Sequence, residues 1–190
     1  MARFTAFLDA CVIVPLAPCD TMLRMADAGA FRPLWSQKVL DEALSALERI
    51  HPDVDPSRFR SRFRSMNEAF DDALVEGWEP LVAGIELPDP DDAHVVAAAL
   101  LGRADVIVTE NTKHFPDSAL APLGLEAIRT DEFLLDQFDM SPAATCRIVT
   151  EQSAATRRPP VEISQLLDRL ARSGAPNFAH HVAAELQRDS

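Results

Sequence analysis

The sequence has no apolar run that approaches the ~20 residues of a membrane-spanning helix, and it has no internal repeats or low-complexity tracts. Its first residues, Met1-Ala2-Arg3-Phe4, lack the cationic region and the long apolar stretch of a secretion signal. We therefore expect a soluble protein with no membrane partner.

Cysteine is scarce and does not occur in metal-binding pairs. The three cysteines, Cys11, Cys19 and Cys146, cannot all pair with one another, and an odd, sparse count suits the reducing cytoplasm. Each thiol is expected to be a small buried apolar group. The adjacent His180 and His181 would point ~100° apart on a helix, so no zinc site is expected.

Positive charge is also in short supply. Lys and Arg total 18 and Asp and Glu total 30, so the formal net charge is −12. This balance argues against non-specific nucleic-acid binding, which depends on cations that neutralise phosphates. The exception is local, because Arg58, Arg60, Arg62 and Arg64 fall within seven residues. The acidic excess also suits a carboxylate-rich metal site or a surface that receives a basic partner.

Apolar residues make up 47% of the 190 residues, which is enough for one sizeable core with an appended segment. Periodicity predicts strands that alternate with helices, and this alternation is typical of a mostly parallel α/β sheet. Strands are expected at 4–8, 31–35, 79–82, 104–109 and 127–130, and helices at 20–28, 39–50, 56–70, 90–101 and 131–138. Ser36, Asp55, Asp89 and Asp131 are the expected caps.

The end of the chain carries no strand signal beyond Met140-Ser141-Pro142. Three short helices are expected there, at 142–157, 161–173 and 177–188, separated by Pro159-Pro160 and Gly174-Ala175-Pro176. We therefore predict an α/β domain over residues 1–138 and an all-helical extension over 139–190.

Polar side chains follow two of the predicted strands. In an open α/β sheet, ligands bind beyond the carboxyl ends of the strands, where Asp9 and Asn111 are expected. Asp91 and Asp92 begin the helix that precedes the second of these strands. Oxygen atoms that converge in this way repel one another unless a cation such as Mg²⁺ or Mn²⁺ joins them.

Each of these residues has a simpler interpretation. Asp91 and Asp92 suit the positive end of a helix dipole, and Asn111 suits a turn. Glu42 has Lys38 four residues before it, which predicts a solvated helix pair. Asp9 is harder to dismiss, because an unpaired carboxylate after a buried strand costs several kcal/mol. The arginines suit a solvated helix face.

Four elements of the sequence, in this order, resemble the PIN-domain nucleases, and in particular the VapC-type toxins of bacterial toxin–antitoxin pairs. They are residues 7–12 (FLDACV), 40–42 (LDE), 89–99 (DPDDAHVVAAA) and 106–116 (VIVTENTKHFP). The resemblance covers about residues 4–130, and the helical end is similar to an extension found on one branch of these toxins.

The resemblance implies a three-layer α/β/α fold, with residues 1–138 as the nuclease domain and an acidic pocket that binds Mg²⁺ or Mn²⁺. The implied catalytic residues are Asp9, Glu42, Asp92 and Asn111, with Asp9 and Asp92 as metal ligands. Asn111 stands where many PIN domains have a fourth Asp, which puts two-metal occupancy in doubt. The candidate substrate contacts are Arg58, Arg62, Lys113 and His114.

The implied activity is hydrolysis of RNA by a toxin that a cognate antitoxin neutralises, and the implied assembly is a homodimer. The stripe of Phe59, Phe63, Met66 and Phe70 is either the antitoxin groove or ordinary core. The main rival is a catalytically silent PIN-like module that binds RNA or protein, which the net charge and Asn111 favour. A phosphatase of the haloacid-dehalogenase type would need a second Asp at position 11, where this chain has Cys11.

Overall fold

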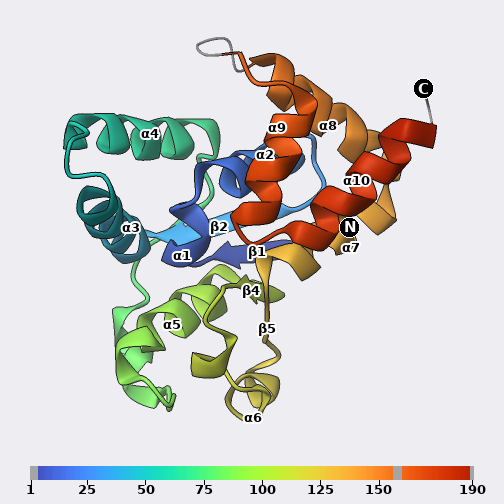
Figure 1. Cartoon of the computed structure of the whole chain (residues 1–190). Helices are drawn as coiled ribbons and strands as arrows, with labels where there is room; N and C mark the ends of the chain where they lie inside the picture. The colour runs from blue at the N-terminus through green and yellow to red at the C-terminus, as the bar shows by residue number, and fades with distance from the viewer. Residues whose placement is uncertain (1–3, 156–159, 189–190) are drawn as a thin grey trace. The chain divides into compact units, whose positions relative to one another are not determined.

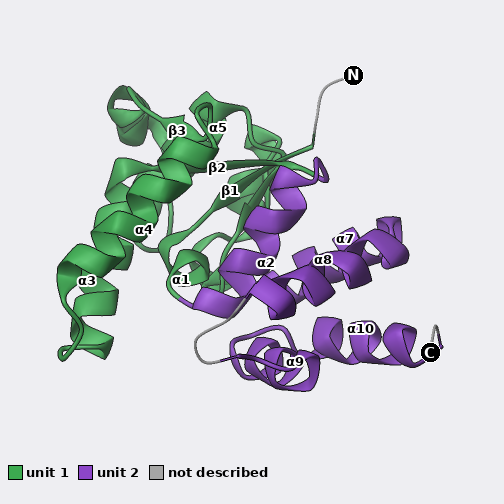
Figure 2. Cartoon of the chain, turned by 90° about the horizontal axis from the view of Figure 1, so that it is seen from above, with its two compact units in different colours: residues 1–14, 31–128 green, residues 15–30, 129–190 purple. Residues whose placement is uncertain are grey.

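The computed structural model describes residues 4–155 and 160–188, which form two compact units (Figures 1 and 2). The first unit comprises Met1–Val14 and Phe31–Ile128, and the second comprises Pro15–Ala30 and Arg129–Ser190. The elements of the first unit are β1 (Thr5–Leu8), α1 (Ala10–Ile13), β2 (Arg32–Ser36), α3 (Gln37–Ile50), α4 (Pro56–Ala69), β3 (Leu74–Val75), α5 (Ala93–Gly102), β4 (Val106–Val108), α6 (Asp117–Leu120) and β5 (Glu126–Ile128), with 3-10 helices η1 (Glu79–Gly84), η2 (Pro90–Asp92), η3 (Thr112–His114) and η4 (Ala121–Leu123).

The five strands of the first unit form a parallel sheet in the order β3-β2-β1-β4-β5. The chain runs outward from β1 to β3 and then crosses back to β4 through α5. Because such crossovers are right-handed, α5 lies on the face opposite α3 and α4. Figure 1 shows this arrangement, with α6 on the same side as α5. The expected three-layer α/β/α architecture is confirmed.

The change of direction occurs between β1 and β4, which are hydrogen-bonded neighbours. The segments that follow these two strands depart toward opposite faces of the sheet, which opens a crevice at their carboxyl ends. Asp9 directly follows β1, and Thr109 directly follows β4. The topology therefore brings residues that are 100 positions apart in the sequence to one place.

The core of the first unit is packed closely around the two central strands and α5. Every residue of β1 and β4 is buried, and so is each residue of α5 from Ala93 to Ala99. A helix that is apolar all round suits this enclosed position. At its end, a Cβ on Gly102 would lie 2.5 Å from Leu34 Cδ1 and 2.9 Å from Val75 Cγ2. Glycine therefore allows α5 to approach β2 and β3.

The strand expected at 79–82 is wrong. These residues belong to the 3-10 helix η1, and the strand of this region is the two-residue β3, which lies before Gly77 and pairs with β2. Pro80 has no N–H to donate to a neighbouring strand and fits the first turn of a helix instead.

The second unit is helical and contains α2 (Leu16–Asp27), α7 (Thr130–Met140), α8 (Pro142–Ala155), α9 (Ile163–Arg172) and α10 (Pro176–Arg188). Here α2 packs on α8 and α9, and α10 packs on α7, α8 and α9. The expected C-terminal helices are confirmed, while residues 156–157 and Pro159 lie outside the described residues. The boundary expected after residue 138 stays a prediction. None of the described helices has the length and apolar character that crossing a bilayer requires.

Asp131 was expected to cap its own helix, and this expectation is wrong. Arg129 holds the cap position of α7, where its N–H donates to Glu132. The Asp131 carboxylate instead accepts hydrogen bonds from the backbone N–H groups of Asn177 at 3.2 Å and Phe178 at 2.9 Å. Asp131 therefore satisfies free donors at the start of α10 and joins it to α7.

Candidate active site

Asp9 is a buried carboxylate at the carboxyl end of β1, with 7% of its surface exposed. Its Oδ1 accepts from the N–H of Ala10 at 2.7 Å, where it caps the short helix α1. Its Oδ2 accepts from the Thr109 hydroxyl at 2.7 Å and from the Cys11 thiol at 3.2 Å. These neutral donors compensate for the lost hydration of the carboxylate and fix its orientation.

The hydrogen bonds continue into the segment after β4. The Cys11 sulfur accepts from the N–H of Glu110 at 3.2 Å, and the Thr109 hydroxyl oxygen accepts from the N–H of Asn111 at 3.1 Å. Burial and, second, the negative charge of Asp9 raise the pKa of the Cys11 thiol to about 12. The thiol therefore stays protonated and can donate to Asp9. The exposed Asn111 is joined to Asp9 through Thr109, and its side chain caps no helix.

A second group of side chains with metal-ligating atoms comprises Asp92 on the 3-10 helix η2, His114 on η3 and Asp89, the residue before η2. Nδ1 of His114 lies 2.6 Å from Asp92 Oδ2 and 3.9 Å from Asp89 Oδ2, and one ligand atom from each residue lies within 4.8 Å of the others. Burial raises the pKa of Asp92, the His114 contact lowers it, and the charges of Asp89 and Asp9 raise it further. Asp92 therefore lies within electrostatic reach of Asp9.

The chemistry of this donor set fits a divalent cation. After burial, the charges of Asp89 and Asp9 are the causes that raise the pKa of Asp92, and a cation placed among such carboxylates would stabilise their ionised forms. Mg²⁺ and Mn²⁺ prefer oxygen ligands, and an imidazole nitrogen such as that of His114 suits the transition metals better than Mg²⁺.

Asp89 was expected only as a cap. Its Oδ1 does accept from the N–H of Asp91 at 3.1 Å, but its Oδ2 faces His114.

Glu42 lies on α3 and contacts a histidine instead of the lysine of its own helix. Its Oε1 lies 3.0 Å from Nε2 of His94, whose side chain is only 3% exposed. Among residues 4–155 and 160–188, no ion pair joins Lys38 to Glu42. The solvated helix pair that the sequence suggested is therefore replaced by a contact between α3 and α5.

The chain matches two family models. Residues 5–113, more than half of the chain, match the model described as PIN domain. The chain belongs to the PIN domain family. Residues 130–184 match the model described as VapC50 C-terminal domain. The resemblance of the sequence to PIN domains is therefore confirmed, and the helical end is similar to a segment known from one VapC protein.

One relative of this PIN domain is the Mycobacterium tuberculosis (strain ATCC 25618 / H37Rv) protein named "Putative ribonuclease VapC50". The two sequences are 42% identical over 107 residues, which are 56% of this chain and 62% of the relative. The match thus spans about three fifths of the length of that protein. No solved structure matches the chain significantly.

The arginines of this PIN domain that were expected to hold phosphates differ in their surroundings. Arg62 donates to the carbonyl oxygens of Ile13 at 2.6 Å and Val14 at 3.5 Å, at the end of α1. Arg60 pairs with Glu48 at 3.3 Å, and Arg58 is exposed. Lys113 is exposed on η3, next to His114. Arg58 and Lys113 are therefore more accessible to a ligand than Arg62.

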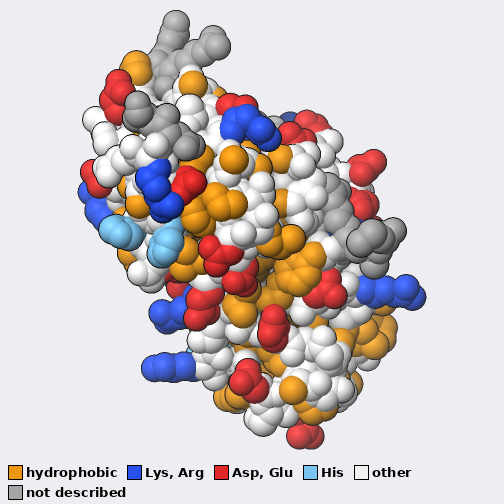
Figure 3. Space-filling model, turned by 90° about the vertical axis from the view of Figure 1, so that its right-hand side faces the viewer, with side chains coloured by type: hydrophobic (Ala, Val, Ile, Leu, Met, Phe, Trp, Pro, Cys, Tyr) orange, Lys and Arg blue, Asp and Glu red, His pale blue; other side chains and the backbone are white. Residues whose placement is uncertain are grey.

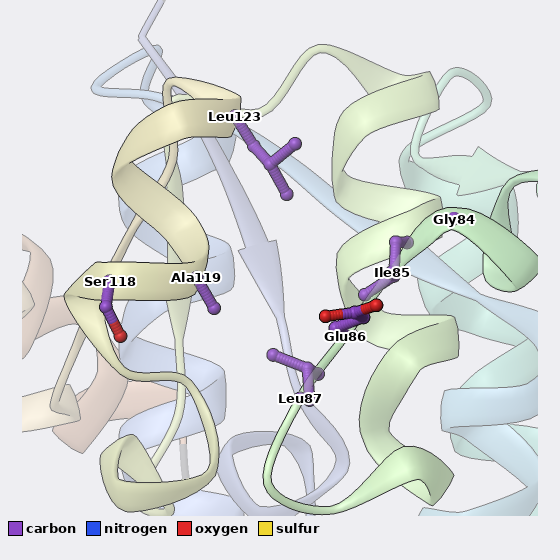
Figure 4. Close-up of a pocket in the computed structure, with 7 residues that line it drawn as sticks. All are labelled: Gly84, Ile85, Glu86, Leu87, Ser118, Ala119 and Leu123. Carbon is purple, nitrogen blue, oxygen red and sulfur yellow. The ribbon is translucent and has the colours of Figure 1, made fainter.

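Acidic side chains are spread widely over the face seen in Figure 3, whereas the basic side chains drawn there stand apart from one another. A pocket of about 380 Å³ lies between residues 84–87 and the α6–η4 segment (Figure 4). Leu87, Ala119 and Leu123 point into it from the two walls. Among the residues that line this pocket, Glu86 is charged and none is Lys or Arg, so it offers no cation to a phosphate.

From the sequence we predicted no functional role for Thr109, Asp89 or His94, and we expected Cys11 to be only a small buried apolar group. Thr109 and Cys11 had a usable signal, since both are small residues with a polar atom within three positions of a strand end. His94 had none, because a lone histidine in an alanine-rich helix is most simply a core residue.

Proposed function

We propose that this PIN domain is a metal-dependent endoribonuclease that hydrolyses phosphodiester bonds of RNA with Mg²⁺ or Mn²⁺ as cofactor. The observation that carries the proposal is the cluster of Asp89, Asp92 and His114, whose ligand atoms lie within 4.8 Å of one another in a chain that matches the PIN domain. Asp9 and Asp92 are the proposed metal ligands, and Glu42 and Asn111 complete the proposed catalytic set. A bound ion would activate a water molecule and stabilise the charge that develops on the phosphodiester.

The other residues of the site would keep these carboxylates in place. Thr109 and Cys11 hold Asp9 by donating to Oδ2, so its orientation does not depend on the metal. His114 contacts Asp92 and is 43% exposed, so its ring is accessible to RNA. Arg58 and Lys113 are the other exposed candidates for phosphate contacts, which position RNA without selecting its sequence. Arg62 would act by supporting the segment that follows Asp9.

We further propose that the protein is the toxin of a toxin–antitoxin pair. Support comes from the match of residues 130–184 to the VapC50 C-terminal model and from the similarity to the M. tuberculosis protein. The proposed partners are a cognate antitoxin and a second copy of the chain. The three cysteines form no disulfide among the described residues, which suits the cytoplasm. A groove of about 420 Å³ between α3 and α4, lined by Phe63, Arg60 and Glu68, is the proposed antitoxin surface.

The second candidate is a silent PIN module that binds RNA or protein without cutting it. Two observations favour it, namely an amide at Asn111 and the net charge of −12, both of which weaken cation or RNA binding. Cleavage separates the two candidates. The silent module would bind RNA but would not cleave it in Mn²⁺. The nuclease would cleave RNA in Mn²⁺, and EDTA would prevent this cleavage.

The deciding experiment compares antitoxin-free wild type with Asp92→Asn and Asp91→Asn in a cleavage assay with Mg²⁺, Mn²⁺ or EDTA. We expect metal-dependent cleavage by wild type and a loss in Asp92→Asn larger than the ~10–100-fold that follows loss of an outer-shell partner. Asp91 is exposed on the same 3-10 helix, so Asp91→Asn is the matched control and should cleave normally. Full activity of Asp92→Asn would contradict the assignment of this ligand.

A further inference from the structure

His94 lies at the second position of α5 and connects this helix to Glu42 on α3. The contact joins Nε2 of the imidazole to Oε1 of the carboxylate at 3.0 Å. Because an ionised carboxylate can only accept a hydrogen bond, Nε2 must carry the hydrogen and donate it. This requirement holds whether or not Nδ1 also carries a proton.

The His94 ring has little freedom to move. Its side chain is 3% exposed, and the ring of Trp78 packs against it with 5.8 Å between the ring centroids. The residues on both sides of it, Ala93 and Val95, are buried as well. Glu42 is 41% exposed, so without this contact its side chain could adopt several rotamers. The buried ring of His94 therefore sets the position of the Glu42 side chain.

The burial of His94 is unusual for a residue with no function. Its Nδ1 is buried and finds no hydrogen-bond partner among the described residues. An unsatisfied buried polar atom destabilises the folded protein. An apolar side chain of similar size would avoid this cost and fill the same space. The contact with Glu42 is the feature that an apolar side chain would lose.

His94 also lies two residues after Asp92, the proposed metal ligand at the end of η2. One short segment of the chain therefore carries both Asp92 and His94, whose Nε2–H donates to Glu42. This arrangement ties the carboxylate of α3 to the segment that supplies Asp92, so the two acidic groups are placed by one rigid support.

We propose that His94 is a positioning residue that holds the Glu42 carboxylate in its working orientation through the Nε2–H···Oε1 hydrogen bond. The proposal rests on the proposed nuclease function. His94 acts only through Glu42 and touches neither RNA nor metal. Its side chain therefore matters for cleavage only as long as position 42 carries a carboxylate.

The test replaces His94 by Gln, which keeps an N–H donor at nearly the reach of Nε2, and by Leu, which keeps the bulk and loses the donor. In Mn²⁺ we expect His94→Leu to lower kcat about 10–100-fold, as is usual for loss of an outer-shell partner. KM for RNA should change little, and His94→Gln should retain most of the wild-type kcat. His180→Leu, on the exposed side of α10, is the control.

A double-mutant cycle with Glu42→Ala separates positioning from a purely structural role. If His94 acts through Glu42, His94→Leu should slow the wild type but not the Glu42→Ala variant, so that the two losses do not add. Equal losses in both backgrounds, or a His94→Gln variant as slow as His94→Leu although both are folded, would overturn the proposal.

A readout that needs no cleavage keeps this proposal separate from the proposed function. Glu42→Ala should shift the Nε2 signal of His94 in ¹⁵N NMR of the metal-free protein, and His94→Leu should weaken Mn²⁺ binding only when Glu42 is present. If wild type cuts no RNA, the nuclease proposal fails, while these two measurements still decide whether His94 positions Glu42. An unchanged Nε2 signal together with unchanged Mn²⁺ affinity would overturn the positioning role.

Discussion

Asp9 is held by groups that are not charged, and this arrangement explains how a carboxylate can stay buried at the end of a strand. Its hydrogen bonds come from the backbone of Ala10 and the side chains of Thr109 and Cys11. A network of this kind keeps the carboxylate in one orientation whether or not a cation is bound. Removal of one donor should therefore affect both stability and catalysis.

We expect Thr109→Val to lower the free energy of unfolding by about 1–3 kcal/mol, because the isosteric side chain leaves Asp9 Oδ2 without its shortest hydrogen bond. RNA cleavage should fall as well. Thr109→Ser keeps the hydroxyl and is the matched control. Urea unfolding of the three proteins measures the difference, and equal midpoints for the valine and serine variants would show that this hydrogen bond contributes nothing to stability.

Close packing between the helices and strands of the first unit depends on small residues as much as on large ones. Helix α5 packs on β2, β3 and β4, and its last residue, Gly102, lies against Leu34 and Val75. Because Asp92 and His94 lie at the other end of the same helix, the position of α5 also sets the geometry of the site.

We expect Gly102→Ala to destabilise the protein by about 1–3 kcal/mol, since the added Cβ would lie 2.5 Å from Leu34 Cδ1 and force a shift in the core. Gly84 provides the control, because a Cβ there would meet no atom within 4 Å. Gly84→Ala should stay within about 0.5 kcal/mol of wild type. Thermal or urea unfolding measures both, and a Gly102→Ala variant as stable as wild type would show that α5 can move away from β2.

In the second unit, Asp131 joins two helices that begin 46 residues apart. We expect Asp131→Ala to lower the free energy of unfolding by about 0.5–2 kcal/mol, the usual effect of losing a capping side chain. The exposed Asp136 lies on the same helix, and Asp136→Ala is the matched control. Hydrogen exchange at the first turn of α10 should rise in the Asp131 variant alone. Unchanged protection there would mean that water replaces the carboxylate at no cost.

At the scale of the whole molecule, much of the fold could be predicted from the sequence. The alternation of strands and helices, the caps at Ser36 and Asp55, and the place of Asp9 after β1 are all local signals, and the structure has them. The strand β3 has only two residues, which is too short for any periodicity. The assignment of α2 to the helical unit depends on its packing partners, which its own pattern does not reveal.

The candidate site was less predictable, because its contacts join distant positions. Local spacing paired Glu42 with Lys38, whereas the fold supplies His94 as a partner 52 positions away in the sequence. Asp89 was correctly expected as a cap, but a side chain with two oxygen atoms can serve a cap and a cluster together. The spacing of residues within one helix predicts the capping contact of Asp89 but not its contact with His114.

For the proposed RNA substrate, the net charge of −12 leaves local positive charge as the route of approach to the molecule. Arg58 is exposed and free to contact a phosphate, whereas Arg62 donates to the carbonyl oxygens at the end of α1. We therefore expect Arg58→Ala to reduce the dependence of log K on log salt by roughly 0.7 for single-stranded RNA, the value for one lost phosphate contact. Arg62→Ala should act mainly by lowering stability.

Arg147 on α8 is 66% exposed and lies 3.9 Å from Glu151, so Arg147→Ala removes the same charge from the helical unit and is the control. The measurement is RNA affinity against salt for metal-free, antitoxin-free protein. Because all three variants change the net charge equally, a general effect of charge would shift all three slopes alike. A smaller slope in Arg58→Ala alone would assign the effect to a phosphate contact at α4, and equal slopes in Arg58→Ala and Arg147→Ala would exclude such a contact.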